Sequence, residues 1–176
     1  MAQLVDESFV RQFVEAWTAA WNANDVQQIA SLCTEDIVVH DPWPQGGIIR
    51  GREEMSYYFG QLFKALPGVQ WEYVSDPFLA LDARRAAGWW RMSGTMTRRL
   101  DPPGFEPTNG QIHLEGIDIW AFQDGLLSEY TVIFDMLGFG RQVGIVPEPG
   151  TFGDRMGLWM QHRKAKTLRR SASSGG

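Results

Sequence analysis

Asp118 is the residue of this sequence whose surroundings best suit acid/base chemistry, and a second carboxyl, Asp41, also follows an apolar run. Asp118 is the one carboxyl in an apolar and aromatic run, residues 117–122, and Asp41 ends a second apolar run directly before Pro42. A carboxyl in an apolar pocket loses solvation of its charged form, which raises its pKa. Two such carboxyls that face one pocket can differ in pKa, so that one serves as a base and the other as a neutral donor.

The segment around Asp118 predicts a β-hairpin. β-Branched and aromatic residues flank Gln123-Asp124-Gly125, which indicates a three-residue loop with Gly125 in the left-handed conformation of a G1 bulge. Phe122 then pairs with Leu126, and Asp118 lies opposite Tyr130. Side chains alternate along each strand, so we expect Asp118 to be enclosed by rings on one face of the hairpin. That face consists of Asp118, Trp120, Phe122, Leu126, Ser128, Tyr130, Val132 and Phe134.

Each candidate also has an ordinary structural explanation. Asp41 can cap the turn that follows it, and Asp118 can bond to a neighbouring backbone group or to an interface partner. Trp17 belongs to an apolar helical stripe and fits a core position, and Tyr130 can simply form a cavity wall. His113 and Glu115 share a strand face, but no third ligand follows at a spacing typical of a metal site.

The chain predicts helices first and strands afterwards. Apolar residues recur at helical spacing in residues 8–24, with Asp6 as the N-cap, and again in residues 26–33 and 51–66. Further short helices are predicted within residues 134–144 and 152–160. Runs rich in β-branched residues predict strands over residues 37–41, 69–74 and 86–97, followed by the hairpin. This order indicates an α+β domain with its helices on one face of a bent antiparallel sheet.

Composition and charge indicate a globular protein and argue against a nucleic-acid-binding domain. A hydrophobic content of 44% with 21% charged residues is typical of globular proteins. Residues 1–160 carry 11 basic and 21 acidic side chains, a balance of −10, which argues against a nucleic-acid-binding domain. Residues 161–176 add five basic and no acidic side chains and predict a disordered tail after a single domain over residues 1–160.

The same sequence predicts a cytoplasmic protein. Cys33 is the single cysteine, so no disulfide can form within the chain. No apolar run approaches the length of a membrane span, and the first residues do not read as a secretory signal. We therefore expect no membrane partner and no nucleic-acid partner.

The order of elements, together with particular residues, resembles the NTF2-like superfamily and, within it, the SnoaL-like and ketosteroid isomerase families. Residues 22–42 are similar to the helix–helix–strand opening of ketosteroid isomerases, whose general base stands before a Pro, here Asp41. Residues 117–122 resemble the strand that carries their second, protonated Asp, here Asp118. Segments 90–95 and 134–147 are similar to pieces common in SnoaL-like proteins.

This resemblance implies an NTF2-like cone, in which three N-terminal helices pack on a strongly curved sheet around an apolar pocket. It implies a cofactor-independent isomerase or polyketide cyclase, without metal, for a lipophilic carbonyl compound such as a steroid, polyketide or terpenoid. Asp41 is the expected base, and protonated Asp118 the expected donor to the enolate, with Trp17 or Tyr130 as a second donor. A homodimer is expected from the resemblance alone. The expected pocket residues are Val39, Phe59, Phe63, Trp90, Met92, Trp120, Val132 and Phe134.

Departures from the families leave other functions open. Trp17 and Phe59 stand where the isomerases carry Tyr. Epoxide hydrolases of the same fold use an Arg–Asp pair and another Asp, and the aligned residues here are Trp90, Met92 and Val132. The alternatives are a non-catalytic protein that binds a lipophilic small molecule, and an epoxide hydrolase or epoxide-opening cyclase.

Overall fold

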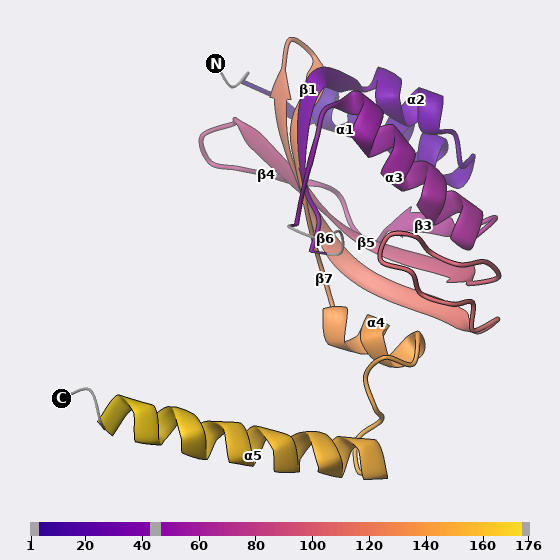
Figure 1. Ribbon diagram of the computed structural model, residues 1–176. Helices are drawn as coiled ribbons and strands as arrows, with labels where there is room; N and C mark the ends of the chain where they lie inside the picture. Colours follow the sequence, from indigo (N-terminus) through magenta and orange to yellow (C-terminus); the bar gives the residue numbers. More distant parts are fainter. Residues whose placement is uncertain (1–3, 43–46, 174–176) are drawn as a thin grey trace.

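The computed structural model describes residues 4–42 and 47–173 and has the expected α+β architecture. Figure 1 shows three helices covering one face of a strongly bent sheet, with two further helices after the last strand. The helices are α1 (Glu7–Asn22), α2 (Val26–Ser31), α3 (Arg52–Ala65), α4 (Met136–Gln142) and α5 (Phe152–Ser173). The strands are β1 (Cys33–His40), β2 (Ile48–Arg50), β3 (Gln70–Tyr73), β4 (Phe78–Leu79), β5 (Arg85–Thr95), β6 (Gln111–Gln123) and β7 (Leu126–Phe134).

The sheet runs in the order β2-β1-β7-β6-β5-β3, and β4 pairs with β5. All of these pairs are antiparallel except β1 and β7, which run parallel. The sequence predicted an antiparallel sheet throughout. The difference arises because about half of the chain separates β1 from β7, so no tight turn dictates its direction.

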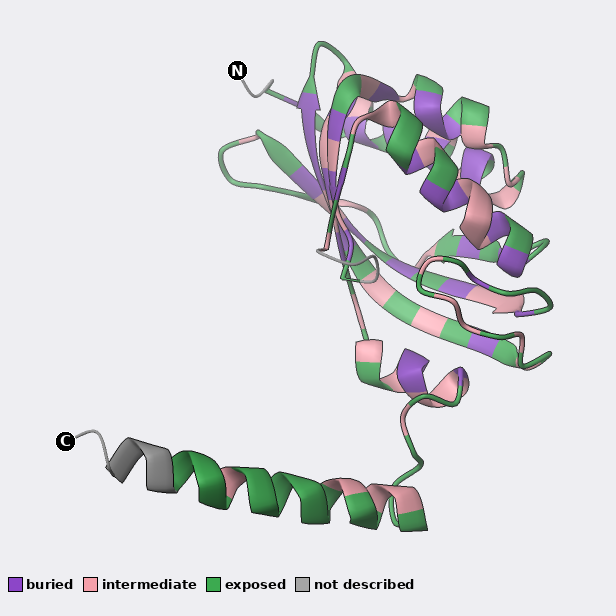
Figure 2. Cartoon of the chain, in the orientation of Figure 1, coloured by how far each residue is buried: buried purple, intermediate pink, exposed green. Residues whose placement is uncertain are grey.

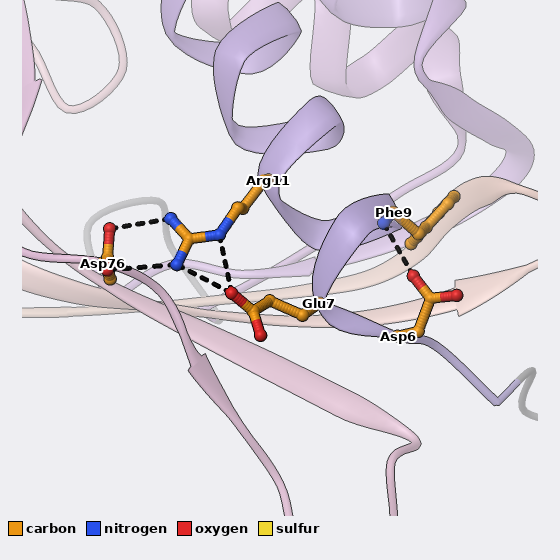
Figure 3. Close-up of polar contacts among 5 residues, drawn as sticks. All are labelled: Asp6, Glu7, Phe9, Arg11 and Asp76. Atoms are coloured by element: carbon orange, nitrogen blue, oxygen red, sulfur yellow. Dashed lines mark hydrogen bonds and ion pairs between the residues drawn. The ribbon is translucent and has the colours of Figure 1, made fainter.

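Helix α1 begins and packs as its sequence predicts. The Asp6 carboxylate accepts a hydrogen bond of 2.8 Å from the backbone N–H of Phe9 and so caps the helix (Figure 3). On the exposed side, Arg11 forms two hydrogen bonds of 2.8 and 3.0 Å with Asp76, and one of 2.9 Å with Glu7. These contacts attach α1 to the loop after β3. Its buried side, which faces the sheet, consists of Val10, Phe13, Trp17, Ala20 and Trp21.

The core between the helices and the sheet is built mainly of rings. Trp21 stacks on Trp71 with ring centroids 4.8 Å apart, and Trp71 packs on Trp90 at 4.2 Å. Trp17 meets the edge of Tyr130 at 5.3 Å. Figure 2 shows buried residues along the three N-terminal helices and along the strands that these helices cover. Interlocked rings of this kind leave little freedom for the side chains around Asp118.

The hairpin of β6 and β7 has a different turn from the one predicted. Gln123 pairs with Leu126, and Asp124 and Gly125 have φ of 52° and 81°, so the loop has two residues. Two positive φ values are typical of a type I′ turn, which matches the twist of the strands and suits Asp-Gly. The left-handed Gly125 was predicted correctly, but the three-residue loop was wrong.

A bulge then shifts the register further along this hairpin. The pairing moves from Phe122–Leu127 to Ala121–Glu129, which leaves Ser128 as the extra residue. Leu127 is consequently fully buried, whereas Leu126 and Ser128 are half-buried and do not belong to the inner face as predicted. Asp118 pairs with Val132 rather than with Tyr130.

The end of the chain is also more ordered than predicted. The tail expected to be disordered over residues 161–176 is helical to Ser173, as the second half of α5, and residues 174–176 lie outside the described residues. Leu, Ala, Lys and Arg dominate this part, and these residues favour a helix. No helix in residues 4–42 or 47–173 is long and apolar enough to cross a membrane.

Candidate functional site

Asp118 is fully buried on the inner face of β6 and is held by three donors. Its Oδ1 accepts hydrogen bonds of 2.7 Å from Nε1 of Trp90 and 3.0 Å from the hydroxyl of Tyr130. Its Oδ2 accepts one of 2.8 Å from the hydroxyl of Tyr73. Strands β3, β5 and β7 each contribute one donor, so the sheet itself positions the group. Tyr130 reaches Asp118 from a diagonal position, because its direct partner across the strands is Trp120.

Two glycines make room for the rings around Asp118. Gly88 is paired directly with Asp118, and a Cβ there would lie 2.5 Å from atoms of both Trp120 and Tyr73. Gly116 precedes Asp118 on the same face of β6, and a Cβ there would collide with the ring of Trp90. Glycine in a strand interior costs conformational entropy but permits such close approach. The glycines therefore allow Tyr73 and Trp90 to lie over the carboxyl.

Burial raises the pKa of Asp118 to about 7 from its ordinary value of 3.8. The hydrogen bonds from Tyr73, Tyr130 and Trp90 stabilise the charged form and act against this rise. The negative charge of Asp41 adds to it, so the two carboxyls interact electrostatically. Asp118 can therefore hold or release a proton near neutral pH.

Asp41 lies just after the end of β1, with 8% of its surface exposed. The hydroxyl of Tyr58, from α3, donates a hydrogen bond of 3.2 Å to its Oδ2. Burial, followed by the charge of Asp41, raises the pKa of Tyr58 well above its usual value, so this hydroxyl remains a donor. This contact ties Oδ2 of Asp41 to α3 at the wall of the pocket.

An apolar pocket lies between α3, the inner face of the sheet and α4. Its empty space is about 600 Å³ when the open mouth is included. Polar groups in its wall are few and include Asp41, Tyr58 and Tyr130. The apolar part of the wall consists of Trp21, Phe59, Leu62, Leu66, Trp71, Trp90, Met92, Leu100, Leu114, Val132, Phe134 and Phe139.

The pocket brings together only some of the residues singled out from the sequence. Of the four candidate catalytic residues, Asp41 and Tyr130 line it, whereas Asp118 and Trp17 do not. Asp118 lies behind the wall because its three donors cover both oxygens, and Trp17 is fully buried against Tyr130.

The residues expected to line the pocket also fall into two groups, those in its wall and those in the core. Phe59, Trp90, Met92, Val132 and Phe134 line the pocket. Three expected wall residues, Val39, Phe63 and Trp120, are buried in the core outside it. Sequence alternation assigns a residue to the inner face but does not tell how deep in the layer its side chain ends.

Tyr58 and Tyr73 are site residues that the sequence did not reveal. Family resemblance pointed to the position of Phe59, yet its neighbour Tyr58 carries the hydroxyl that reaches Asp41. The signal available for Tyr73 was indirect. Gly88 and Gly116 interrupt two strands rich in large residues, and a glycine there indicates the close approach of another group.

Among the described residues, the outer face of the sheet holds no candidate metal centre. His113 and Glu115 lie there, and Glu115 contacts Arg91 at 3.4 Å. Among the residues that the structure describes, no group of three or more His, Cys, Asp or Glu side chains could hold a metal ion. His40, also on the outside, lies 3.6 Å from Glu129.

Helices on one face of a curved, open sheet, with a pocket between the two layers, define an NTF2-like α+β domain. The SnoaL-like domain model matches residues 14–130, and the chain therefore belongs to the SnoaL-like family. A search of curated protein sequences gave no match.

Solved structures share this fold at low sequence identity. TsrD from Streptomyces laurentii has a TM-score of 0.67 with 21% identity, over 81% of this chain and 99% of its own. A candidate SnoaL-like polyketide cyclase from Jannaschia has a TM-score of 0.68 with 15% identity, over 84% of this chain and 99% of its own. A protein with a ketosteroid isomerase-like fold from Catenulispora acidiphila was solved with trimethylamine. It has a TM-score of 0.61 with 17% identity, over 77% of this chain and 94% of its own.

Proposed function

We propose that this protein is an acid/base enzyme, an isomerase or cyclase, that acts on a lipophilic carbonyl compound without a cofactor. The observation that carries the proposal is the hydrogen bond from Tyr130, which lines the pocket with Asp41, to the buried Asp118. This contact connects the pocket to a second carboxyl with a pKa of about 7. Asp41 as the base and Tyr130 as a neutral donor then face one substrate.

Asp41 is the proposed base. Its carboxylate takes a proton from the carbon next to the substrate carbonyl, and the electron pair of the broken C–H bond moves into an enolate. In isomerisation, protonated Asp41 returns the proton to another carbon of the conjugated system. In cyclisation, the enolate carbon attacks a second carbonyl, whose oxygen finally takes the proton. The hydrogen bond from Tyr58 orients Asp41 for either reaction.

Tyr130 is the proposed donor to the enolate oxygen. Its hydroxyl hydrogen points to Asp118 when Asp118 is charged. When Asp118 is protonated, its O–H can donate to the Tyr130 oxygen, and the Tyr130 hydroxyl becomes free to donate into the pocket. Asp118 thus acts through Tyr130 and does not touch the substrate. This differs from direct donation by Asp118, which the family resemblance implied.

The pocket wall favours an apolar substrate with acceptor oxygens. Most of the wall is apolar, which suits a polycyclic or polyketide-like skeleton. Nε1 of Trp21 is buried without a hydrogen-bond partner among the described residues, and its ring lines the pocket. An unpaired buried donor is costly, so an acceptor oxygen on the ligand would be stabilised there.

A lipophilic binder without catalysis is the second candidate. The engagement of both Asp118 oxygens by the protein's own donors favours it, because Asp41 is then the one carboxyl in the described pocket wall. Epoxide opening is disfavoured, because Trp90, Met92 and Val132 present apolar surface where the epoxide hydrolases place charged groups.

Proton exchange in heavy water tests the proposal without knowledge of the natural product. β,γ-Unsaturated steroid ketones and β-diketones are incubated with the enzyme in D2O, and deuterium beside the carbonyl is measured by mass spectrometry. Asp41→Asn should slow exchange by about 100-fold or more, with ligand affinity, measured by Trp fluorescence, retained. Asp36→Asn, on the exposed side of β1, is the matched control and should exchange normally. If the ligand binds but the wild type and Asp41→Asn exchange deuterium at the same rate, the result supports a lipophilic binder without catalysis.

A further inference from the structure

Helix α5 leads away from the cone and is open to solvent (Figures 1 and 2). No side chain in residues 152–169 is buried. Phe152, Met156 and Trp159 are 80%, 47% and 55% exposed, although they are large and apolar. Their spacing of four and three residues places them along one side of the helix. This side of α5 therefore lies outside the core of the cone.

Basic side chains continue the same side of α5. Arg163 and Lys166 follow Trp159 by four and seven residues. The guanidinium of Arg163 lies 4.7 Å from the centre of the Trp159 ring, which agrees with this placement. We call Phe152, Met156, Trp159, Arg163 and Lys166 the α5 line. It is apolar in the half of the helix nearer the cone and basic in the other half.

The acidic residue of α5, Asp154, lies away from this line. It follows Phe152 by two residues, which is about 200° around the helix, and its carboxylate accepts a hydrogen bond of 2.8 Å from the backbone N–H of Gly150. Residues 152–173 hold six basic side chains and this one acidic side chain, a balance of +5. Residues 1–151 hold 10 basic and 20 acidic side chains, a balance of −10. Helix α5 is therefore a basic element attached to an acidic domain.

The order of side chains along the α5 line matches the layers of an anionic lipid surface. Such a surface has phosphates above an apolar interior, and Trp is enriched at the boundary between them. A cluster of about four to eight basic residues on an amphipathic helix is typical of binding to anionic lipids. A nucleic acid would contact the basic half of the line but leave Phe152 and Met156 in water. The two halves together therefore favour a bilayer.

The acidic cone does not oppose this contact strongly. Charges act on a surface over about one Debye length, which is about 8 Å at physiological salt. The acidic side chains are spread over the whole cone, whereas the basic half of α5 would lie at the surface itself. The expectation of no membrane partner rested on the absence of a spanning run. A helix that lies in the interface needs no such run.

We propose that α5 is a membrane-surface helix, which binds bilayers containing anionic phospholipid by laying the α5 line against them. Phe152, Met156 and Trp159 enter the boundary of the acyl layer, and Arg163 and Lys166 bind lipid phosphates. The lipid surface also stabilises α5, because a helix without tertiary packing is only marginally stable in water. The contact does not depend on the proposed reaction, since it requires neither Asp41 nor a substrate in the pocket.

Flotation of the full chain with vesicles tests the contact. Wild type should bind vesicles of equal parts phosphatidylcholine and phosphatidylserine at low salt, bind phosphatidylcholine vesicles much more weakly, and dissociate in about 0.5 M salt. Trp159→Ala should lower the partition coefficient roughly tenfold, because it removes buried apolar surface. The double variant Arg163→Gln with Lys166→Gln should lower it about 25-fold, since each basic residue at the surface contributes about fivefold.

Matched controls alter the same types of side chain away from the α5 line. Leu168→Ala truncates an apolar side chain that follows Trp159 by nine residues and so lies on the opposite side of α5. Arg50→Gln with Arg84→Gln removes the same charge from exposed positions on the cone. Both controls should bind vesicles as wild type does. Circular dichroism should show that all of these variants are folded.

A fluorescent label tests which side of α5 meets the lipid. Met156→Cys and Leu168→Cys are labelled with bimane, and Cys33, fully buried, stays unmodified. On phosphatidylserine vesicles the emission of the label at 156 should shift to shorter wavelength, and that at 168 should not. The proposal is overturned by a wild type that does not bind these vesicles, that binds phosphatidylcholine vesicles equally well, or that is retained by duplex DNA instead. Binding that survives both α5 substitutions, or equal shifts of the two labels, would also overturn it.

Discussion

The hydroxyl of Tyr130 lies 3.0 Å from Oδ1 of Asp118, while the same Tyr130 forms part of the pocket wall beside Asp41. A side chain that contacts both a buried carboxyl and an open pocket can change its hydrogen bonding in the pocket when the carboxyl gains or loses a proton. Tyr73 bonds to the same carboxyl at 2.8 Å but does not line the pocket. This pair of tyrosines offers a direct comparison between a catalytic and a structural role.

Tyr130→Phe should lower the rate of proton exchange by roughly 100- to 1,000-fold, because it removes the donor to the developing enolate. Tyr73→Phe removes an equivalent hydrogen bond to Asp118, at an expected cost of about 1–3 kcal/mol in the free energy of unfolding for either variant. Urea unfolding should therefore find the two variants similarly destabilised. Exchange of deuterium should be much slower in Tyr130→Phe than in Tyr73→Phe. Equal rates in the two variants would contradict the role of Tyr130 as the donor to the enolate.

The pH dependence of activity should report the proton on Asp118. With a pKa of about 7, Asp118 is protonated below neutral pH and ionised above it. The exchange rate should therefore fall as the pH rises through about 7, since an ionised Asp118 draws the Tyr130 hydroxyl hydrogen away from the pocket. In Asp118→Asn this fall should be absent. A fall at the same pH in Asp118→Asn would assign it to another group.

Stability should depend on pH in the opposite sense to that of a salt-bridged carboxyl. The pKa of Asp118 is raised in the folded chain, to about 7 from 3.8, so the folded state holds a proton that the unfolded state has already lost. Its stabilising contribution is complete below about pH 4, decreases by up to about 1.4 kcal/mol per pH unit, and is lost above about pH 7. Subtracting the curve for Asp118→Asn from that for wild type isolates this slope.

The effect of replacing Asp118 should depend on whether the new side chain can form hydrogen bonds with the three donors that surround it. An amide can accept from Trp90 and Tyr130 through its oxygen and donate to a reoriented Tyr73 hydroxyl, so Asp118→Asn should fold. Asp118→Leu leaves all three donors buried without an acceptor, at an expected cost of at least about 3 kcal/mol. Thermal unfolding at pH 5 is the appropriate measurement. Similar melting temperatures for the two variants would contradict the network.

Gly116→Ala should displace Trp90 from Asp118, because the added methyl group would collide with the indole ring and with the backbone carbonyl of Ile133. We expect a loss of about 2 kcal/mol or more in the free energy of unfolding. Gly60→Ala, in α3, is the control, since a Cβ there would meet the side chain of Val26 at an ordinary contact distance of 3.9 Å. That substitution should stabilise by up to about 1 kcal/mol through helix propensity. Guanidinium unfolding of both variants measures the difference.

Helical periodicity, capping and the order of elements were sufficient to predict the fold class. The stripe on α1 and the Asp6 cap are local features, and the contacts in the structure agree with them. The Asp-Gly turn was located correctly for the same reason. Family resemblance added the cone and identified the two aspartates, because it depends on residue order rather than on contacts.

Features that depend on contacts between distant segments could not be read in this way. The bulge at Ser128 moved the register of β7, since the packing of Leu127 against the core outweighs the simplest alternation. Asp118 lies behind the pocket wall because β3, β5 and β7 each bring a donor to it, and the donors are up to 45 residues away in sequence. Sequence determined that a carboxyl would be buried among rings. Only the folded sheet decided that Tyr130 stands between that carboxyl and the pocket, since a hydrogen bond depends on where three strands meet.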